Sequence, residues 1–588
     1  MINNSELKTQ NSKLKTQNSK LKTDPVNTQN LLEKLRQIVG AKYVMTDPGQ
    51  TERYRTGYRF GTGNALAVVR PATLWEQWQV LEACVEADVI VISQAANTGI
   101  TGGSNPFGND YDRDVVIINT MRNDNIQLIL DGAQAVCLPG STLNHLEEEL
   151  KPYGREPHSV IGSSCIGASV IGGVCNNSGG SLVQRGPAYT EMALYAQRNA
   201  EGKLELVNHL GIDLGTTPQE ILTNLQEGKY QKKDIQQTDK RGHDHDYCNH
   251  VRQIDADTPA RFNADPARRY EASGSAGRLA VFAVRVDTFP AEKQTAVFYI
   301  GTNDTKVLTE LRRHMLGSFE QIPISGEYIH RTAFDIAAKY GKDTFWYIKH
   351  VGTEYLPKLF ALKAWADRVA KKIPFMPHHF SEKFLQGTSK LMPQHLPQIM
   401  WDYRHQYEHH LILKMGGKGV EEARKYLKEY FADKSKGAYF ECDPQLAQAA
   451  MLLRFAVASA AIRYRSVHEK EVEDIVALDI ALKRNEEDWF EQLPPEIDNK
   501  ILHKLYYGHF MCHVFHQDYV IKKGYNCEEI EEEMLKILDK RGAEYPAEHN
   551  VGHLYHAKDS LKNFYKELDP TNSFNSGIGK TSKKKDWK

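Results

Sequence analysis

The chain has 588 residues, which is too many for one hydrophobic core, so we expect two to four domains. Lys and Arg number 74 against 75 Asp and Glu, a net charge of -1, which argues against a protein that binds nucleic acid through bulk positive charge. The eight cysteines are dispersed with no CxxC pair, a pattern typical of a reducing compartment. The first residues contain no apolar stretch of the signal-peptide kind, so export is not expected.

The N-terminal end is repetitive. Residues 7–23 read LKTQNSK, LKTQNSK and LKT, with one leucine in each seven-residue period. One apolar position per heptad is too few for the seam of a coiled coil. We therefore predict that residues 1–28 form a disordered, dispensable extension.

Helices and strands alternate after this extension. The spacing of Leu31, Leu32, Leu35 and Ile38 predicts a first helix, and Thr73 opens a second over 73–87. Strands are expected at 65–71, 88–95 and 114–120, and a helix capped by Ser141 follows the segment QAVCLPG. This α+β or α/β region ends with a long strand near residue 287.

The middle of the chain has a different composition. Between residues 345 and 401, aromatic residues alternate with lysines and arginines, and prolines interrupt the pattern. A solvated, flexible insertion and a nucleic-acid surface are two interpretations, but docking on an anionic membrane accounts better for both residue types. The longest apolar run, 449–462, contains Arg454 and is too short to cross a bilayer, so we expect a buried or interfacial helix there.

Two stretches rich in Gly and Ser stand out, AANTGITGGSNPFG at 95–108 and EPHSVIGSSCIGASVIGGVCNNSGG at 156–180. Exposed backbone amides with no bulky side chains suit a pyrophosphate, although tight loops alone would have a similar composition. No G-x-G-x-x-G fingerprint follows a first strand, which disfavours a Rossmann nicotinamide site. GIGKTS near the C-terminus resembles a phosphate loop, but Phe574 stands where the first glycine of that motif is required, and no helix is expected after it.

These stretches, together with AVVRP, PGSTLNHL, HKLYYGHFMCHVFHQDY and YPAEHNVGHLY, resemble the bacterial quinone-dependent D-lactate dehydrogenases, membrane flavoenzymes of the vanillyl-alcohol-oxidase type. The resemblance covers nearly the whole chain from about residue 29. It implies an α+β fold with a two-subdomain FAD-binding domain. Noncovalent FAD would contact Ala95, Ala96, Asn97, Thr98, Gly99, Gly103, Ser104, Gly162, Ser169, Gly179 and Val281.

A second constellation lies near the C-terminus, in YYGHFMCHVFHQDY and YPAEHNVGH. By similarity to the wider D-2-hydroxyacid dehydrogenases, His509, His516 and Glu548 would hold a divalent metal and His549 would be the catalytic base. Asn550 stands where that family has Gly, and the alternative is that the histidines pack within a helix. A substrate carboxylate favours an arginine, for which Arg463 is the leading candidate, followed by Arg465 and Arg331.

The resemblance also implies a division of the chain. Residues 29–287 and 539–588 would form the FAD-binding domain, 288–329, 407–444 and 469–538 an α+β cap over the substrate, and 330–406 with 445–468 an inserted membrane-binding segment. The expected function is oxidation of D-lactate to pyruvate, with electrons passing through FAD to a quinone. Its expected location is the cytoplasmic face of the inner membrane, bound peripherally to anionic lipids and not to nucleic acid. Alternatives are another D-2-hydroxy acid, such as 2-hydroxyglutarate or glycolate, and a flavin-free membrane scaffold.

Overall fold

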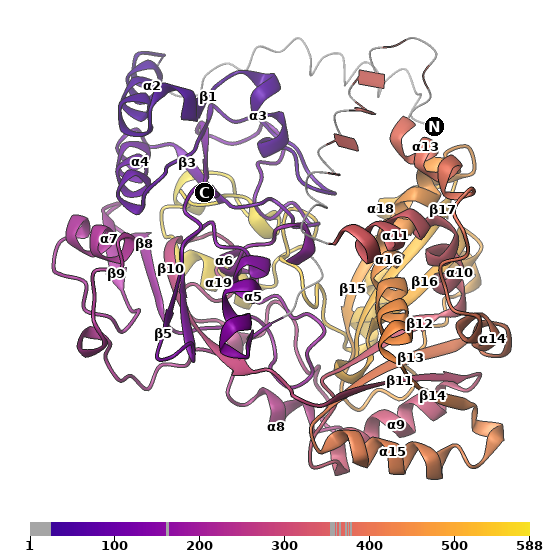
Figure 1. The fold of residues 1–588 in the computed structure, drawn as a ribbon. Helices are drawn as coiled ribbons and strands as arrows, with labels where there is room; N and C mark the ends of the chain where they lie inside the picture. The colour runs from indigo at the N-terminus through magenta and orange to yellow at the C-terminus, as the bar shows by residue number, and fades with distance from the viewer. Residues whose placement is uncertain are drawn as a thin grey trace.

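The computed structural model describes residues 25–159 and 164–352, residues 379–588, and between these the residues 359, 362, 363, 366, 367, 369, 370, 373 and 376. Figure 1 shows two lobes, one built from the N-terminal half and the other from the chain between about 295 and 540, with the C-terminal segment returning to the first lobe. Helix α2 begins at Pro25, inside the stretch assigned to the extension. Residues 1–24 and Gly162 lie outside the described residues.

The first lobe begins with a four-stranded sheet in the order β1-β2-β4-β3. Its parallel strands β2, β4 and β3 are buried and its helices pack around them, as the alternating pattern predicted. Thr73 caps α4 by accepting a hydrogen bond from the Glu76 amide, 3.1 Å away. The elements are α2 (Pro25–Val39), β1 (Val44–Met45), α3 (Pro48–Arg55), β2 (Ala67–Val69), α4 (Leu74–Glu86), β3 (Ile90–Gln94) and β4 (Val115–Asn119).

A second, antiparallel sheet follows in the order β5-β6-β10-β8-β9, with β7 paired to β10. The cap of α5 is Thr142, which accepts from the His145 amide, and Ser141 instead donates to the Asn125 carbonyl, 2.8 Å away. The prediction of a Ser141 cap was therefore wrong by one residue. The elements are β5 (Ile126–Ile129), β6 (Gln134–Cys137), α5 (Leu143–Leu150), β7 (Arg155–Pro157), α6 (Val170–Cys175), β8 (Ala193–Arg198), β9 (Leu204–Asn208), α7 (Pro218–Gln226), α8 (Tyr247–Val251) and β10 (Ala280–Pro290).

The second lobe is built on a seven-stranded antiparallel sheet in the order β14-β11-β13-β12-β16-β17-β15. Side chains alternate between its two faces. Phe298 and Ile300 pack under α9, α15 and α18, whereas Val297 and Tyr299 pack under α10 and α16. The strands are β11 (Thr295–Thr302), β12 (Ser325–His330), β13 (His409–Gly416), β14 (Ala438–Cys442), β15 (Val472–Ala481), β16 (Ile501–His509) and β17 (Val514–Lys522).

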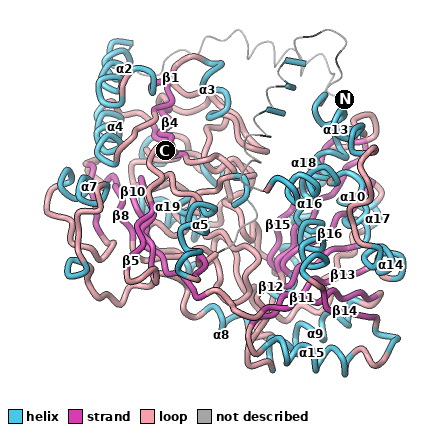
Figure 2. The backbone as a smooth tube through the Cα atoms, viewed as in Figure 1, coloured by secondary structure: helices cyan, strands magenta, loops and turns pink. Residues whose placement is uncertain are grey.

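The tube view shows how helices flank this sheet (Figure 2). They are α9 (Thr305–Ser318), α10 (Arg331–Tyr340), α11 (Lys342–Val351), α13 (Phe380–Ser389), α14 (Gln398–Gln406), α15 (Gly419–Tyr430), α16 (Pro444–Val467), α17 (Pro495–Asp498) and α18 (Cys527–Arg541), and α19 (Asp559–Leu568) lies in the first lobe. Among the described residues, α16 alone is long and apolar enough to cross a membrane by length and composition. One of its faces is buried against α10 and the sheet, and 39% of its apolar 18-residue window lies inside the molecule.

The C-terminal segment completes the first sheet. The Val91 amide donates to the Ser573 carbonyl at 2.9 Å, and the Asn575 amide donates to the Val91 carbonyl at 2.8 Å. Phe574, between them, is buried in the same core as β3 and β4. The first glycine-rich loop leaves β3 directly, so this tail lies beside the loop.

Candidate functional site

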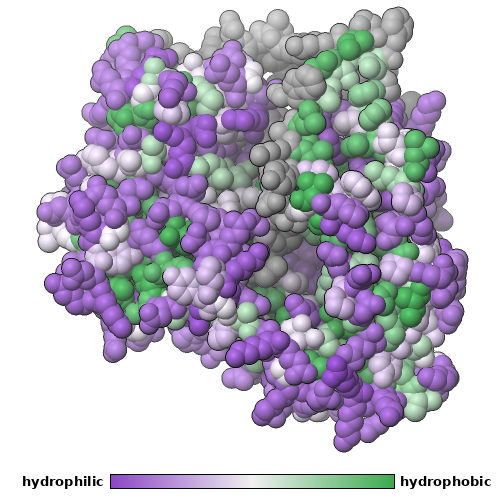
Figure 3. Space-filling view, in the orientation of Figure 1, coloured by the Kyte–Doolittle hydropathy of each residue, from purple (hydrophilic) through white to green (hydrophobic). Residues whose placement is uncertain are grey.

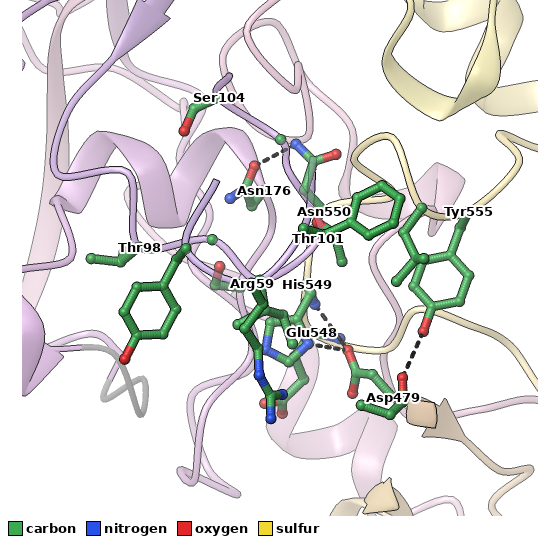
Figure 4. A pocket seen from close by; sticks show the side chains of 18 of the residues that line it. Arg59, Thr98, Thr101, Ser104, Asn176, Asp479, Glu548, His549, Asn550 and Tyr555 are labelled. Carbon is green, nitrogen blue, oxygen red and sulfur yellow. Dashed lines mark hydrogen bonds and ion pairs between the residues drawn. The ribbon is translucent and has the colours of Figure 1, made fainter. Parts of the chain in front are cut away.

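A cavity of about 1470 Å³ lies between the two lobes. Both glycine-rich stretches line it, and so do residues from α16, β15, β16 and β17 and from the loop after α18. The structure brings together in this lining the described residues predicted to contact FAD, which are Ala95, Ala96, Asn97, Thr98, Gly99, Gly103, Ser104, Ser169, Gly179 and Val281. Figure 4 shows Thr98 and Ser104 in the same close-up as Glu548 and His549.

The loop after β3 presents bare backbone to this cavity. Within the described part of the chain, the backbone amides of residues 96–101 donate no hydrogen bond. Asn97 adopts the left-handed conformation with φ of 55°, and its side chain donates to the Thr56 carbonyl and accepts from the Ser104 hydroxyl. A Cβ atom at Gly99 would have no neighbour within 4 Å. The loop therefore fits a diphosphate, whose oxygens accept hydrogen bonds from such amides.

The second stretch connects the cofactor loops to the histidine cluster. Ser169 caps α6 by accepting from the Gly172 amide at 3.0 Å. A Cβ atom at Gly179 would lie 2.6 Å from Glu548 Oε1 and 2.7 Å from Arg261 Nε. Glycine is therefore required at 179 for the carboxylate of Glu548 and the guanidinium of Arg261 to approach the backbone.

The three predicted metal ligands converge on one point. His509 ends β16, His516 lies in β17 beside it, and Glu548 comes from the loop after α18, so the histidines lie on strands and not within a helix. Their donor atoms form a triangle. His509 Nε2 and His516 Nε2 are 3.4 Å apart, and Glu548 Oε2 lies 3.2 Å from the first and 3.6 Å from the second. Three nitrogen and oxygen atoms at such separations fit a tetrahedral dication with metal–ligand distances of about 2.0–2.2 Å.

Buried carboxylates hold these ligands in place. Glu327 Oε1 contacts His509 Nδ1 at 2.7 Å, Asp479 Oδ1 contacts His516 Nδ1 at 3.3 Å, and Arg261 binds Glu548 at 2.5 Å. Carboxylates behind histidine ligands are usual in metal sites. Burial opposes the charge on His509, yet the two glutamates raise its pKa to about 10. The carboxylates of Glu327 and Glu548 thus attract positive charge to this point. A divalent ion would supply that charge in place of the proton on His509, so the donor set fits a metal.

His549 lies beside this triangle, and Asp479 orients it. Asp479 Oδ2 accepts from the His549 Nδ1 at 2.7 Å and from the backbone amides of Glu548 and His549 at 2.7 and 3.0 Å. This arrangement leaves His549 Nε2 as the free nitrogen of a partly exposed ring. Burial opposes the charged ring, but the neighbouring Asp479 carboxylate raises the pKa of His549 above its usual value.

Asn550, where the wider family has Gly, also takes part in the site. Its side-chain nitrogen donates to Asn176 Oδ1 at 2.8 Å, and its side chain lies 3.1 Å from a Cβ atom placed at Gly103 (Figure 4). The substitution therefore links the loop that carries His549 to both cofactor loops.

The arginines selected from the sequence are occupied elsewhere. Arg463 forms ion pairs of 2.6 Å with both Asp343 and Glu382, Arg465 pairs with Asp474, and Arg331 pairs with Glu408. Arg463 and Arg465 line the same cavity as His549, but these ion pairs engage their guanidinium groups.

Two other arginines lie close to the reactive side chains. Arg454 of α16 pairs with Glu327 at 3.0 Å and lies over the Tyr507 ring. Arg59 lines the cavity and acts electrostatically on His549 and Tyr507, and among the described residues it has no hydrogen-bond or ion-pair partner. Arg59 is therefore a cation available for a carboxylate next to His549.

Sequence reasoning missed Arg59, Arg261, Glu327 and Asp479. Asp479 left the clearest local signal, because it is a single carboxylate within the apolar run IVALDIAL, most of which forms β15. Buried charged residues of this kind are paired, so a cationic or histidine partner was to be expected. Glu327 and the two arginines have no comparable signal, since their partners lie far away in the sequence.

Comparisons with known proteins cover both lobes. The family model described as "FAD binding domain" matches residues 65–197, and the one described as "D-lactate dehydrogenase, membrane binding" matches residues 297–587. A quinone-dependent D-lactate dehydrogenase of Haemophilus influenzae is 73% identical over 562 residues, covering 96% of this chain and 100% of that protein. The protein of the same name from Escherichia coli is 59% identical, over 95% and 97% of the two chains.

Solved structures resemble the fold at low sequence identity. A p-cresol methylhydroxylase crystal structure superposes with a TM-score of 0.55 at 12% identity, covering 95% of this chain and 98% of that one. A 4-ethylphenol oxidase from Gulosibacter chungangensis gives a TM-score of 0.54 at 10% identity, over 95% and 98% of the two chains. Both comparisons concern the fold alone, and together with the matched FAD-binding family model they confirm the predicted α+β class with a two-part FAD-binding domain.

Proposed function

The chain belongs to the quinone-dependent D-lactate dehydrogenase family, and from this premise we propose how its own residues carry out the reaction. It is an FAD-dependent enzyme that associates peripherally with a membrane, oxidises D-lactate to pyruvate and passes the electrons to a quinone. The observation that carries the proposal is the single cavity in which phosphate-binding loops meet a histidine that is paired with a buried aspartate.

The amides of residues 96–101 are proposed to bind the diphosphate of FAD, and Ser169, Gly179 and Val281 to line the part nearer the flavin. When bound, FAD supplies the acceptor for the hydride of the substrate and the store for the two electrons that reduce the quinone. The described cavity also reaches Phe455, Ser459 and Ile462 on one face of α16, a helix assigned to the proposed membrane-binding segment.

Arg59 is proposed to bind the carboxylate of D-lactate, because a planar guanidinium forms two parallel hydrogen bonds with a carboxylate. His549 Nε2 then accepts the proton of the substrate hydroxyl as the Cα hydrogen leaves. Asp479 holds the ring by its other nitrogen, and its negative charge stabilises the imidazolium that forms. The nearby Arg59 charge opposes this imidazolium, which favours return of the proton after turnover.

His509, His516 and Glu548 are proposed to hold a divalent metal that polarises the substrate hydroxyl as a Lewis acid. We expect removal of the ion with a chelator to lower turnover by at least tenfold and addition of Zn²⁺ or Mn²⁺ to restore it. Flavin absorbance recorded on the same samples controls for loss of FAD. Full turnover by chelator-treated, metal-free enzyme would contradict the proposal.

The proposed membrane surface lies on the second lobe. Its exposed large apolar side chains are Trp346, Val351, Leu362, Val369, Ile373, Met376, Phe384, Leu391 and, on α16, Phe455. Figure 3 shows hydrophobic residues gathered along this side of the second lobe, whereas most of the first lobe is hydrophilic. Lys349 and Lys390 are exposed among them, which suits anionic head groups.

We expect the Phe384→Glu and Leu391→Glu variants each to bind vesicles that contain anionic lipid at least tenfold more weakly than the unaltered enzyme. Phe384 is 58% exposed and Leu391 89% exposed, and burying such a side chain in lipid contributes about 1.5–3 kcal/mol. Cosedimentation measures the binding, which should also weaken as salt rises. Tyr153→Glu, a comparable change on the first lobe, is the control. Equal binding by all of these variants would contradict the proposed surface.

The cytoplasmic face is proposed as the side of attachment. Seven cysteines within the described residues are free, among them Cys84, Cys137 and Cys512, which are buried. Unpaired cysteines are typical of a reducing compartment.

The division into domains remains a proposal with the boundaries given above. The three stretches assigned to the cap contain nearly all of the seven-stranded sheet, with β12 extending one residue beyond 329. Helices α10, α11, α13 and α14 fall within the stretches assigned to the membrane-binding segment, and α16 begins one residue before its second stretch.

A hydroxy-acid panel tests the proposed substrate site. We expect the purified yellow protein to be reduced fastest by D-lactate, because Arg59 offers a cation beside His549 for its one carboxylate. Faster reduction of the flavin by D-2-hydroxyglutarate, which has two carboxylates, would contradict this assignment.

A further inference from the structure

A second cluster of metal-ligating side chains lies in the first lobe, away from the site described above. It consists of His243 and His245, from the sequence RGHDHDY before α8, and Asp287 of β10. His243 Nδ1 lies 2.5 Å and His245 Nε2 3.9 Å from the same atom, Asp287 Oδ2, and the two imidazole centroids are 4.3 Å apart. One carboxylate oxygen thus faces two imidazole rings.

The cluster is held in this arrangement by the backbone and by a neighbouring amide. The Asp287 amide donates to the Gly242 carbonyl at 3.1 Å, and Gln134 Nε2 donates to Asp287 Oδ1 at 2.7 Å. A Cβ atom at Gly242 would lie 2.6 Å from the Asp287 carboxyl group, so only glycine permits this approach. The backbone therefore brings these side chains together. A bound ion would replace the hydrogen bond between His243 and Asp287, because donor atoms around a tetrahedral dication lie about 3.3 Å apart.

Hydrogen bonding within the cluster does not satisfy all of these groups. Asp287 can accept from His243 at 2.5 Å, but His245 at 3.9 Å is beyond hydrogen-bond distance from the same oxygen. A dication would bind His245 Nε2 as a ligand. The side chains of His243, His245 and Asp287 are 23%, 50% and 19% exposed, so an ion can enter from solvent and water can complete its coordination.

A third imidazole lies at the back of the cluster. The antiparallel pairing of Pro157 with Thr288 places His158 opposite Asp287 at the end of β7. His158 is fully buried, and its Nδ1 has no hydrogen-bond partner among the described residues. The ring therefore lies next to the cluster, directly after the strand that pairs with β10.

We propose that His243, His245 and Asp287 bind a transition-metal dication such as Zn²⁺, Ni²⁺ or Cu²⁺. Two imidazole nitrogens and one carboxylate oxygen are the ligands that these ions prefer over Mg²⁺ and Ca²⁺. Along β10, Asp287 is six residues from Val281, which lines the cofactor cavity, a separation of about 20 Å at about 3.3 Å per residue. The ion would thus fasten residues 241–246 to β10 without taking part in D-lactate oxidation.

Metal counting on the FAD-loaded enzyme tests this site. The protein is treated with a chelator, dialysed against Zn²⁺, and analysed for zinc and FAD per chain. We expect His243→Ala and His245→Ala each to bind one zinc ion fewer than the unaltered chain, and the double variant to lose no more than either single variant. Turnover of D-lactate and flavin content should be unchanged, which shows that the variants fold.

The control is His209→Ala. His209 Nδ1 contacts Glu271 Oε1 at 2.7 Å and is similarly exposed, but no second imidazole shares that carboxylate. This variant should bind as many zinc ions as the unaltered chain. In Cu²⁺-loaded samples, the electron paramagnetic resonance signal lost in His245→Ala should show coupling to two nitrogens. Equal zinc content in the unaltered chain and in both cluster variants would overturn the proposal, as would an equal loss in His209→Ala.

Discussion

Replacement of His549 by alanine should lower the rate of flavin reduction by D-lactate by about 10²- to 10⁴-fold, the usual contribution of a general base. The side chain is held by Asp479 through Nδ1, and its Nε2 has no partner among the described residues. His516 also faces Asp479, but its Nε2 lies against His509 and Glu548. The measurement is anaerobic stopped-flow reduction of the bound flavin, because this isolates the step at the substrate from the later transfer to quinone.

The matched control is His556→Ala. His556 also lines the cavity, but it is exposed and no ion pair to it occurs within the described residues. Its replacement should leave the rate within about twofold of the unaltered enzyme. Flavin content must be equal in both variants, so that a lost cofactor is not mistaken for a lost base. A His549→Ala enzyme that reduces its flavin at the normal rate would remove the assigned role.

The Arg59→Met variant is expected to lose about 10- to 100-fold in kcat/KM for D-lactate. Hydrogen bonds to charged groups contribute about 1.5–3 kcal/mol, and about 1.4 kcal/mol corresponds to a factor of ten. Arg59→Lys should lose less, because it keeps the charge without the planar pair of donors. The effect should appear mainly in KM if the guanidinium binds the carboxylate equally in the ground state and the transition state.

Arg463→Met separates this assignment from the one made from the sequence. Arg463 is almost fully buried between Asp343 and Glu382, so its removal leaves two acids without their shared partner and should lower the thermal stability. A rise in KM in Arg463→Met with none in Arg59→Met would show that the choice made from the sequence was right. Vesicle-free assays with a soluble electron acceptor keep membrane binding out of the comparison.

The contrast between these two arginines shows what the sequence could and could not predict. Thr73, the β2 and β3 runs and the two glycine-rich loops have local signals, namely a cap, a hydrophobic pattern and missing side chains, and the structure has these elements where they were expected. The α+β class, FAD and the D-lactate dehydrogenase function were predicted from long motifs and are confirmed. Each of these features can be recognised from residues that are close together in the sequence.

The site residues that the sequence did not indicate are paired with residues far away in the chain. Glu327 and His509 are 182 residues apart, and Arg261 and Glu548 are 287 residues apart. No periodicity relates such positions, so the sequence indicated the histidines but not the acids behind them. Arg463 looked suitable by residue type because its partners, Asp343 and Glu382, lie 120 and 81 residues away.

The tail that pairs with β3 has a consequence for biosynthesis. A ribosome that adds about 5–20 residues per second needs roughly half a minute to a minute and a half to proceed from the first glycine-rich loop to Phe574. During that time β3 lacks its last neighbour, and neither Glu548 nor His549 has yet been made. The nascent N-terminal lobe must therefore wait with an open sheet edge, and FAD can enter its finished binding site only when translation is nearly over.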